Sequence, residues 1–451
     1  MMRHFKLAFW GSLALLAALW LIADPHALQP SSFFALRGSM VQLSGVLTMG
    51  CMSLAMILAL RPRWPERWFG GLDKMYRLHK WLGIGGLVLA VTHWLWSQGF
   101  KWAVGFGWLE RPARGARPAV DNAIQQFLLT QRGTAEVVGE WAFYAAVLLI
   151  VMALVPVISY QLFYKTHRLI ALVYLVLVFH TVVLMQFSYW LTPLGVIMAG
   201  MLAWGTAAAV LVLLRRVGAS RKAEGRIANL HYYRDLRVLE GDIDIPAGWP
   251  PGWPGHTAGQ FAFVTSDTSE GPHPFTIASA WDRTKHRLTF IVKELGDYTR
   301  ILRSTLYIGQ PVIVEGPYGC FTFDDDAPIQ IWVGGGIGIT PFIARMKQIA
   351  QGKENGLKEI HLFHTTTDYS EEAIAKMTAD ATAADVRLHV LHSPRDGHLS
   401  GDHIRAAVPS WRKASIWFCG PPGFGAALRQ DFASHDFPVS ERFHQELFSM
   451  R

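Results

Sequence analysis

Long apolar runs dominate the first half of the chain. Stretches without a charged residue cover residues 7–23, 38–60, 81–100, 141–164 and 169–214. About 20 apolar residues span a bilayer as a helix, so the last stretch holds two spans that fold back near Tyr189, Trp190 and Pro193. The pattern therefore predicts a bundle of six transmembrane helices, the first of them retained rather than cleaved as a signal peptide.

After about residue 215 the pattern changes to short segments that alternate apolar and polar positions. Candidate strands occupy residues 230–244, 260–265, 275–279, 288–293 and 311–315. Turn signals such as Pro-Pro-Gly at 250–252 and Gly-Pro-Tyr-Gly at 316–319 separate them, which predicts a small antiparallel β-barrel. From about residue 328 strands alternate with helices, which predicts an α/β domain with a parallel sheet.

These changes predict a multidomain membrane protein in four parts. The parts are a transmembrane domain over residues 1–215, a basic linker over 216–226, a barrel over 227–326 and an α/β domain over 327–451. Composition agrees, because a 451-residue chain that is 51% hydrophobic and 17% charged is too apolar to be wholly soluble. Cys51, Cys320 and Cys419 lie far apart and are odd in number, which argues against a disulfide framework or a cysteine-built metal site.

The basic residues indicate how the chain lies in its membrane. Net charge is +8, but Lys and Arg cluster beside apolar runs rather than forming one stripe, which argues against nucleic-acid binding. The segments at 1–6, 61–80, 165–168 and 215–226 carry 15 Lys and Arg, against 6 in the loops at 24–37 and 101–140. The positive-inside rule then places the N-terminus and the C-terminal half in the cytoplasm, with the helices in the cell (inner) membrane.

Four of the six histidines in residues 1–215 lie in the third and fifth predicted spans: His79, His93, His167 and His180. The first two are fourteen residues apart, which places them about 21 Å apart along one face of a helix. The other two are thirteen apart, about 140° around an ideal helix, so the fifth span must be distorted or its ligands must approach from different sides.

Facing one another across two parallel helices, these imidazoles make two levels, each able to supply both axial ligands of a haem. The alternative for a membrane-embedded histidine is a hydrogen bond to a neighbouring helix. Gly83, Gly85 and Gly86 lie between His79 and His93. These glycines either make room for a porphyrin or allow close helix packing.

The second half carries a glycine turn after a buried-type strand, Ile-Gln-Ile-Trp-Val-Gly-Gly-Gly-Ile-Gly-Ile-Thr-Pro at 329–341. Such glycines let a backbone approach a pyrophosphate, and the following helix offers free N–H groups to it. A second strand end, at 416–418, leads into Cys-Gly-Pro-Pro-Gly at 419–423. Both strand ends lie at the carboxyl edge of the predicted sheet, where α/β folds bind ligands.

Together with His-Pro-Phe-Thr at 273–276 and Gly-Pro-Tyr-Gly at 316–319, these features resemble the NADPH oxidase and ferric reductase superfamily over nearly the whole chain. The resemblance implies a ferredoxin-NADP reductase fold for the second half. It implies that His79 and His167 bind an inner haem b and His93 and His180 an outer one. The implied FAD-binding residues are His273, Pro274, Phe275, Thr276, Gly296, Tyr298 and Thr299.

The implied pyridine-nucleotide residues are Gly334, Gly335, Gly336, Gly338, Thr340 and Pro341, with Gly420 and Pro421 beside the nicotinamide. Cys419 and Phe448 are the implied catalytic positions, Phe448 as a terminal aromatic that stacks on the flavin. Members that prefer NADPH commonly carry an Arg after the strand that follows the glycine turn. This chain has His-Thr-Thr-Thr-Asp at 364–368, with Arg395 further on, so NADH and NADPH both remain open donors.

The outer side also departs from the family pattern. Eukaryotic oxidases carry a further His about one turn after the outer ligand of the third span, and this chain has Ser97 there. Arg37, at the outer end of the second span, is either a charged interfacial flank or an attractor for a haem propionate or an anionic acceptor.

The resemblance implies an oxidoreductase that passes electrons from NAD(P)H through FAD and two haems b across a lipid bilayer. The favoured acceptor is molecular oxygen, as in a superoxide-generating oxidase, and a ferric or other metal chelate is the alternative. A third possibility is a soluble-type flavoreductase fused to a haem-free membrane anchor. The sequence identifies no protein partner.

Overall fold

The computed structural model describes residues 2–110, 120–352 and 358–446, and the chain divides into two compact units. Of the described residues, the helical unit contains those within 2–65 and 74–217, and the sheet unit contains those within 66–73 and 218–446. The helices of the first are α1 (Met2–Ala23), α2 (Phe33–Ala59), α4 (Leu72–Gly105), α5 (Ala123–Leu154), α6 (Tyr160–His167), α7 (Ile170–Leu184), η1 (Phe187–Leu191) and α8 (Pro193–Leu213).

Among the described residues, five segments are long and apolar enough to cross a membrane: α1, α2, α5, the joined α6 and α7, and α8. Helix α4 has 34 residues but is not among them. Its apolar residues are diluted by tryptophans, His93 and Gln98. The helical unit is therefore a multi-pass membrane domain, and the sixth span stays a prediction.

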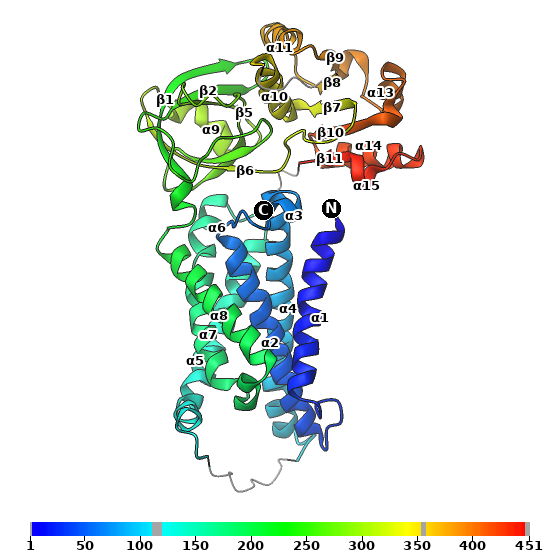
Figure 1. The fold of residues 1–451 in the computed structure, drawn as a ribbon. Coiled ribbons are helices and arrows are strands. Elements are labelled where there is room, and N and C mark those ends of the chain that lie inside the picture. The colour runs from blue at the N-terminus through cyan, green and yellow to red at the C-terminus, as the bar shows by residue number, and fades with distance from the viewer. Residues whose placement is uncertain (1, 111–119, 353–357, 447–451) are drawn as a thin grey trace. The chain divides into compact units, whose positions relative to one another are not determined.

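The chain folds back between α7 and α8 at the predicted place. Helix α7 ends at Leu184, the short 3-10 helix η1 covers Phe187–Leu191, and α8 begins at Pro193. Proline fits the first helical position because the N–H that it lacks has no partner there. In Figure 1 the long helices lie alongside one another, and their shared core includes the fully buried Trp20 and Tyr174.

Helix α5 differs from the charge-free run at 141–164. It begins at Ala123, where the side chain of Asn122 accepts N–H groups of the first turn, and it ends at Leu154, just before Pro156. Its first half carries charged residues, which a search for uncharged stretches misses. The last residues of that run, 160–164, lie in α6, so one apolar run corresponds to parts of two helices.

The sheet unit contains two sheets with the predicted directions. Its antiparallel sheet has the order β4-β3-β6-β1-β2-β5, and a bridge between Ile277 and Phe290 links its two ends. Its parallel sheet has the order β11-β10-β7-β8-β9. The strands are β1 (Lys222–Tyr233), β2 (Val238–Asp244), β3 (Phe261–Thr265), β4 (His273–Thr276), β5 (Arg287–Lys293), β6 (Pro311–Tyr318), β7 (Ile329–Gly335), β8 (Glu359–Thr366), β9 (Arg387–His392), β10 (Ala414–Cys419) and β11 (Phe443–Gln445).

The helices of the unit are α3 (Glu66–Phe69), α9 (Asp297–Thr305), α10 (Thr340–Ala350), α11 (Glu371–Ala383), α12 (Ser393–Asp396), α13 (Gly401–Ala407), α14 (Pro422–Ser434) and α15 (Val439–Arg442), with short 3-10 helices η2 (Ala219–Arg221), η3 (Gly336–Ile339) and η4 (Trp411–Lys413). In Figure 1, α10, α11, α13 and α14 lie around the parallel sheet, and α9 lies beside the antiparallel one. Apolar clusters fill the space on the parallel sheet and inside the antiparallel one.

Two expectations in this unit were wrong in detail. The stretch at 216–226 is not all linker, because β1 begins at Lys222 and its first five residues pair with Pro311–Glu315 of β6. Buried and exposed positions alternate there, as in a half-buried strand. The predicted strand at 230–244 is a hairpin of β1 and β2, whose connection includes Arg237 at φ 51°.

Candidate functional site

The four membrane histidines form two facing pairs. The ring centroids of His79 and His167 are 5.9 Å apart, and those of His93 and His180 are 6.3 Å apart. Imidazole nitrogens bind a metal ion such as zinc at about 2 Å, so rings on opposite sides of one ion have centroids about 6 Å apart. Each pair therefore has the spacing of two axial ligands of one metal.

Three of these imidazoles are oriented by backbone carbonyl groups of neighbouring helices. The Nδ1 atom of His79 lies 3.0 Å from the carbonyl oxygen of Ala55, that of His93 3.0 Å from Val41, and that of His180 2.8 Å from Ala135. Such a bond protonates Nδ1 and leaves Nε2 as the metal-binding atom. The donor set therefore fits bis-histidine haem iron.

Two glycines that the sequence did not single out make space for these rings. A Cβ atom at Gly139 would lie 2.6 Å from Cε1 of His180 and still closer to Nδ1, and one at Gly45 would lie 3.3 Å from Cε1 of His93. The hydroxyl of Ser44 is 3.2 Å from Nδ1 of His93. Their spacing from the histidines follows no helical period, because they lie on α2 and α5 rather than on the ligand-bearing helices.

The distortion expected in the fifth span is present. Helix α6 ends at His167 and α7 begins at Ile170, and around the break Leu169 and Ala171 donate N–H groups to carbonyls three residues earlier. These tighter bonds change the angle per residue, so the two histidines need not follow the 140° offset of an ideal helix. The ring of His167 stacks on Phe163, with centroids 4.9 Å apart.

The glycines between His79 and His93 divide between the two roles considered above. A Cβ at Gly85 would lie 3.0 Å from the Phe9 ring of α1, and one at Gly86 would lie 3.5 Å from Cys51 of α2, so these two allow helices to pack closely. A Cβ at Gly83 would meet nothing within 4 Å among the described residues. Only Gly83 borders open space.

Arg37 takes part in helix packing. Its guanidinium donates to the carbonyl oxygens of Trp96 and Ser97, both at 3.1 Å, and lies over the ring of Phe100. These contacts join α2 to α4 beyond His93. Nearby, a hydrogen bond joins α4 to α5, because the side-chain amide of Gln98 donates to the carboxylate of Glu140 at 3.3 Å.

In the sheet unit, the two segments expected to hold FAD lie together. His273 of β4 stacks on Tyr298 of α9, with centroids 3.8 Å apart and planes 10° apart. Burial lowers the pKa of His273 to about 4, so it is neutral at pH 7. Gly296 caps α9, and the Thr299 hydroxyl accepts the N–H of Gly296 at 2.9 Å, which fixes the first turn of that helix. Pro274, Phe275 and Thr276 complete β4, with Thr276 buried.

The glycine turn connects β7 to α10 as predicted. Gly334 and Gly335 end β7, while Gly336 has φ 55° and a Cβ there would meet nothing within 4 Å among the described residues. A Cβ at Gly338 would lie 2.5 Å from the carbonyl carbon of Cys419, so only glycine lets this turn approach the end of β10. Thr340 and Pro341 begin α10.

Cys419 and the following residues lie at that same edge. The Cys419 side chain is fully buried, and burial raises the pKa of its thiol well above the usual value. The thiol is therefore neutral at pH 7 and packs beside the turn, and a catalytic role for Cys419 stays a prediction. A Cβ atom at Gly420 would lie 3.1 Å from the Cα atom of Gly335, and Pro421 precedes α14. Phe448 lies outside the described residues.

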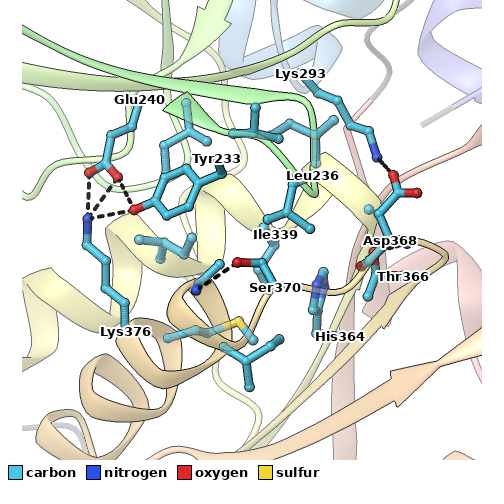
Figure 2. Close-up of a pocket in the computed structure, with 18 of the residues that line it drawn as sticks. Tyr233, Leu236, Glu240, Lys293, Ile339, His364, Thr366, Asp368, Ser370 and Lys376 are labelled. Carbon is cyan, nitrogen blue, oxygen red and sulfur yellow. Dashed lines mark hydrogen bonds and ion pairs between the residues drawn. The ribbon is translucent and has the colours of Figure 1, made fainter. Parts of the chain in front are cut away.

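A pocket that opens to solvent lies next to the glycine turn (Figure 2). Aliphatic side chains of β2, β5, α10 and α11 line most of it. On one side the amino group of Lys376 contacts both carboxylate oxygens of Glu240 at 2.8 Å, and Tyr233 donates to that carboxylate at 2.9 Å. On the other side Lys293 contacts Asp368 at 2.6 Å.

These ion pairs join the antiparallel sheet to the α/β part of the same unit. Burial alone would raise the pKa of Glu240, but the bonds from Lys376 and Tyr233 lower it below the usual value. His364 of β8 also lines the pocket and lies 3.2 Å from the carbonyl oxygen of Gly334. Burial lowers the pKa of His364 to about 4.

The residues considered for nicotinamide preference lie at the ends of β8 and β9. The hydroxyls of Thr365 and Ser393 are 3.2 Å apart. The guanidinium of Arg395 makes two bonds with its neighbour Asp396, at 2.7 and 3.0 Å, and its side chain is 68% exposed. A 2′-phosphate would compete with Asp396 for this arginine.

Comparisons with known proteins agree with this arrangement. The family described as ferric reductase like transmembrane component matches residues 44–178, which include three of the four paired histidines, and an FAD-binding domain family matches residues 236–322. Both matches agree with the resemblance to the NADPH oxidase and ferric reductase superfamily that the sequence motifs carry. His180 lies two residues beyond the first match.

Curated relatives of this chain include plant oxidases and bacterial reductase components. Ferric reduction oxidase 4 of Arabidopsis thaliana is 32% identical over 28% of this chain and 19% of its own. Respiratory burst oxidase homolog protein E of the same plant is 25% identical over 42% and 22%. The glycine betaine monooxygenase reductase subunit of Chromohalobacter salexigens is 25% identical over 39% and 50%. The chain spans about half the length of the reductase and flavohemoprotein relatives that it matches.

Proposed function

We propose that this protein carries electrons across a membrane, from NAD(P)H through FAD to two haems b and then to an acceptor on the outer side. One observation carries the proposal: two pairs of imidazoles face each other at the spacing of axial ligands, and three of the four rings have Nδ1 on a carbonyl group. A protein that used these histidines only for packing would not need both features at both levels.

In this proposal the residues of the chain have separate tasks. FAD converts a two-electron hydride donor into a one-electron donor, and bis-histidine haem carries single electrons without an open site for oxygen. His79 with His167, and His93 with His180, would hold the two haems. The first turn of α9 and the strand β4 would hold FAD, and the turn at Gly334–Gly338 would bind the pyrophosphate of NAD(P)H.

The acceptor that we favour is molecular oxygen, with the N-terminus and the sheet unit in the cytoplasm. The 15 Lys and Arg on one set of connecting segments, against 6 on the other, support this orientation. If the four histidines hold two haems, the haems would supply single-electron transfer, for which no acid or base is needed. The contribution of the membrane residues is therefore ligand orientation and the exclusion of water.

The test uses purified full-length protein supplied with FAD and haem. Pyridine haemochrome spectra should give two haems b per chain, and His93→Ala should give one, while His26→Ala, at an exposed histidine outside the pairs, should keep both. Wild-type protein without haem would contradict the proposal and would favour a flavoreductase on a helical anchor.

The same sample identifies the donor and the acceptor. NADH and NADPH are added separately without oxygen, and the haem absorption bands should show reduction. Oxygen or a ferric chelate is then admitted while superoxide and ferrous iron are measured. Formation of ferrous chelate without superoxide would replace oxygen by a metal chelate as the acceptor.

A further inference from the structure

The two histidine pairs differ in how the Nδ1 atoms are hydrogen bonded. In the outer pair, Nδ1 of both His93 and His180 contacts a backbone carbonyl oxygen, and His93 is also near the hydroxyl of Ser44. In the inner pair only His79 has such a contact. Nδ1 of His167 is buried and has no hydrogen-bond partner among the residues that the structure describes.

The cause of this difference is local. His167 is the last residue of α6, where the chain changes direction before α7, and its ring stacks on the apolar face of Phe163. Its three counterparts lie inside long helices, each beside a neighbour that presents a carbonyl group. The break that lets His167 face His79 thus removes it from any such neighbour in the described chain.

A carbonyl acceptor on Nδ1 makes an imidazole a stronger donor to metal. Stronger donation favours ferric over ferrous iron, so hydrogen bonding of the axial ligands lowers the reduction potential of a haem. The outer pair has two strengthened ligands and the inner pair has one. Ligand basicity alone therefore places the outer potential below the inner one.

We propose that the two haem sites are unequal, with the site of His79 and His167 at a higher reduction potential than the site of His93 and His180. This inference rests on the proposed function. Transfer between the sites moves one electron: the inner iron is oxidised from ferrous to ferric while the outer iron is reduced from ferric to ferrous, and no proton is exchanged. An electron then resides mainly at the inner site until an acceptor withdraws it from the outer one.

The test compares two full-length variants that each retain one site. His93→Ala keeps the inner haem and His167→Ala keeps the outer haem, and both are titrated by optical spectroelectrochemistry in the same detergent and at the same pH. The midpoint potential of His93→Ala should be higher than that of His167→Ala. Equal potentials, or the reverse order, would overturn the inference.

A second measurement covers the case in which a ligand variant loses both haems. Wild-type protein should titrate in two steps, and Ser44→Ala, which removes a hydroxyl beside His93, should raise only the lower step. Thr92→Ala is the matched control, because its hydroxyl bonds within its own helix to Val88. A shift of the higher step, or no shift, would contradict the assignment.

Haem content distinguishes a failure of the proposed function from a failure of the inferred difference in reduction potential. Wild-type protein with fewer than two haems per chain would contradict the proposed function. Two haems with potentials in the wrong order would contradict only the inequality inferred here.

Discussion

The substitution Gly139→Ala tests the outer site through a residue that touches no metal. A Cβ atom there would lie 2.6 Å from Cε1 and 2.8 Å from Cγ of His180, far inside ordinary contact distance. The ring cannot keep both its position and its 2.8 Å contact with the carbonyl of Ala135. Loss of such an outer-shell bond typically lowers metal affinity about 10–100-fold.

We therefore expect Gly139→Ala to bind the outer haem weakly, so that the ratio measured by pyridine haemochrome falls from two haems per chain toward one. The control is Gly133→Ala on the same helix, where an added Cβ would meet nothing within 4 Å among the described residues and both haems should remain. If Gly139→Ala retained two haems with an unchanged spectrum, the orientation that we assign to His180 would be refuted.

Three further predictions concern the sheet unit. Lys376→Met should lower its free energy of unfolding by about 1 kcal/mol in urea, because Lys376 is half-exposed and its pair with Glu240 is partly screened, while the surface change Lys285→Met should have no effect. The free energy of unfolding should fall as pH falls from 6.5 to about 4, because the unfolded chain protonates His364 in this range and the folded chain does not. His364→Gln should remove up to about 3 kcal/mol of this pH dependence, and an unchanged pH profile in the variant would be inconsistent with the burial of His364. Gly338→Ala should abolish NAD(P)H oxidation, because the added Cβ atom would push the glycine turn away from Cys419. Gly423→Ala should retain NAD(P)H oxidation, because its Cβ atom would meet no neighbour within 4 Å among the described residues, and an active Gly338→Ala variant would contradict the close approach of the turn to Cys419.

The sequence predicted the parts of this molecule that depend on local periodicity. Apolar runs predicted the fold-back before Pro193, and the spacing of strands and turn residues predicted both sheets and the helix that begins at Thr340. Helix ends were less predictable where a helix extends into a segment with charged residues, as α5 does between Ala123 and the start of the apolar run. The first part of strand β1 was missed because its basic residues are typical of a linker, although buried and more exposed positions alternate along the strand.

The candidate membrane site shows a different limit. Spacing indicated His79 and His93 on one face. For His167 and His180 it left two alternatives, a distorted span or ligands that approach from different sides, and the break after His167 supplies the distortion. Gly139 could not be found in this way, because its role arises from contact between helices that are distant in sequence. A sequence signal for such a residue would be its invariance among related chains.

Three of the four imidazoles are anchored by the peptide backbone rather than by a side chain, at positions 41, 55 and 135. Any amino acid supplies a carbonyl group, so these three positions can change identity during evolution without losing the anchor, provided that the helix stays in place. Selection on ring orientation would then act on the residues that set helix distance, such as the glycines, and would leave the anchoring positions themselves free to vary.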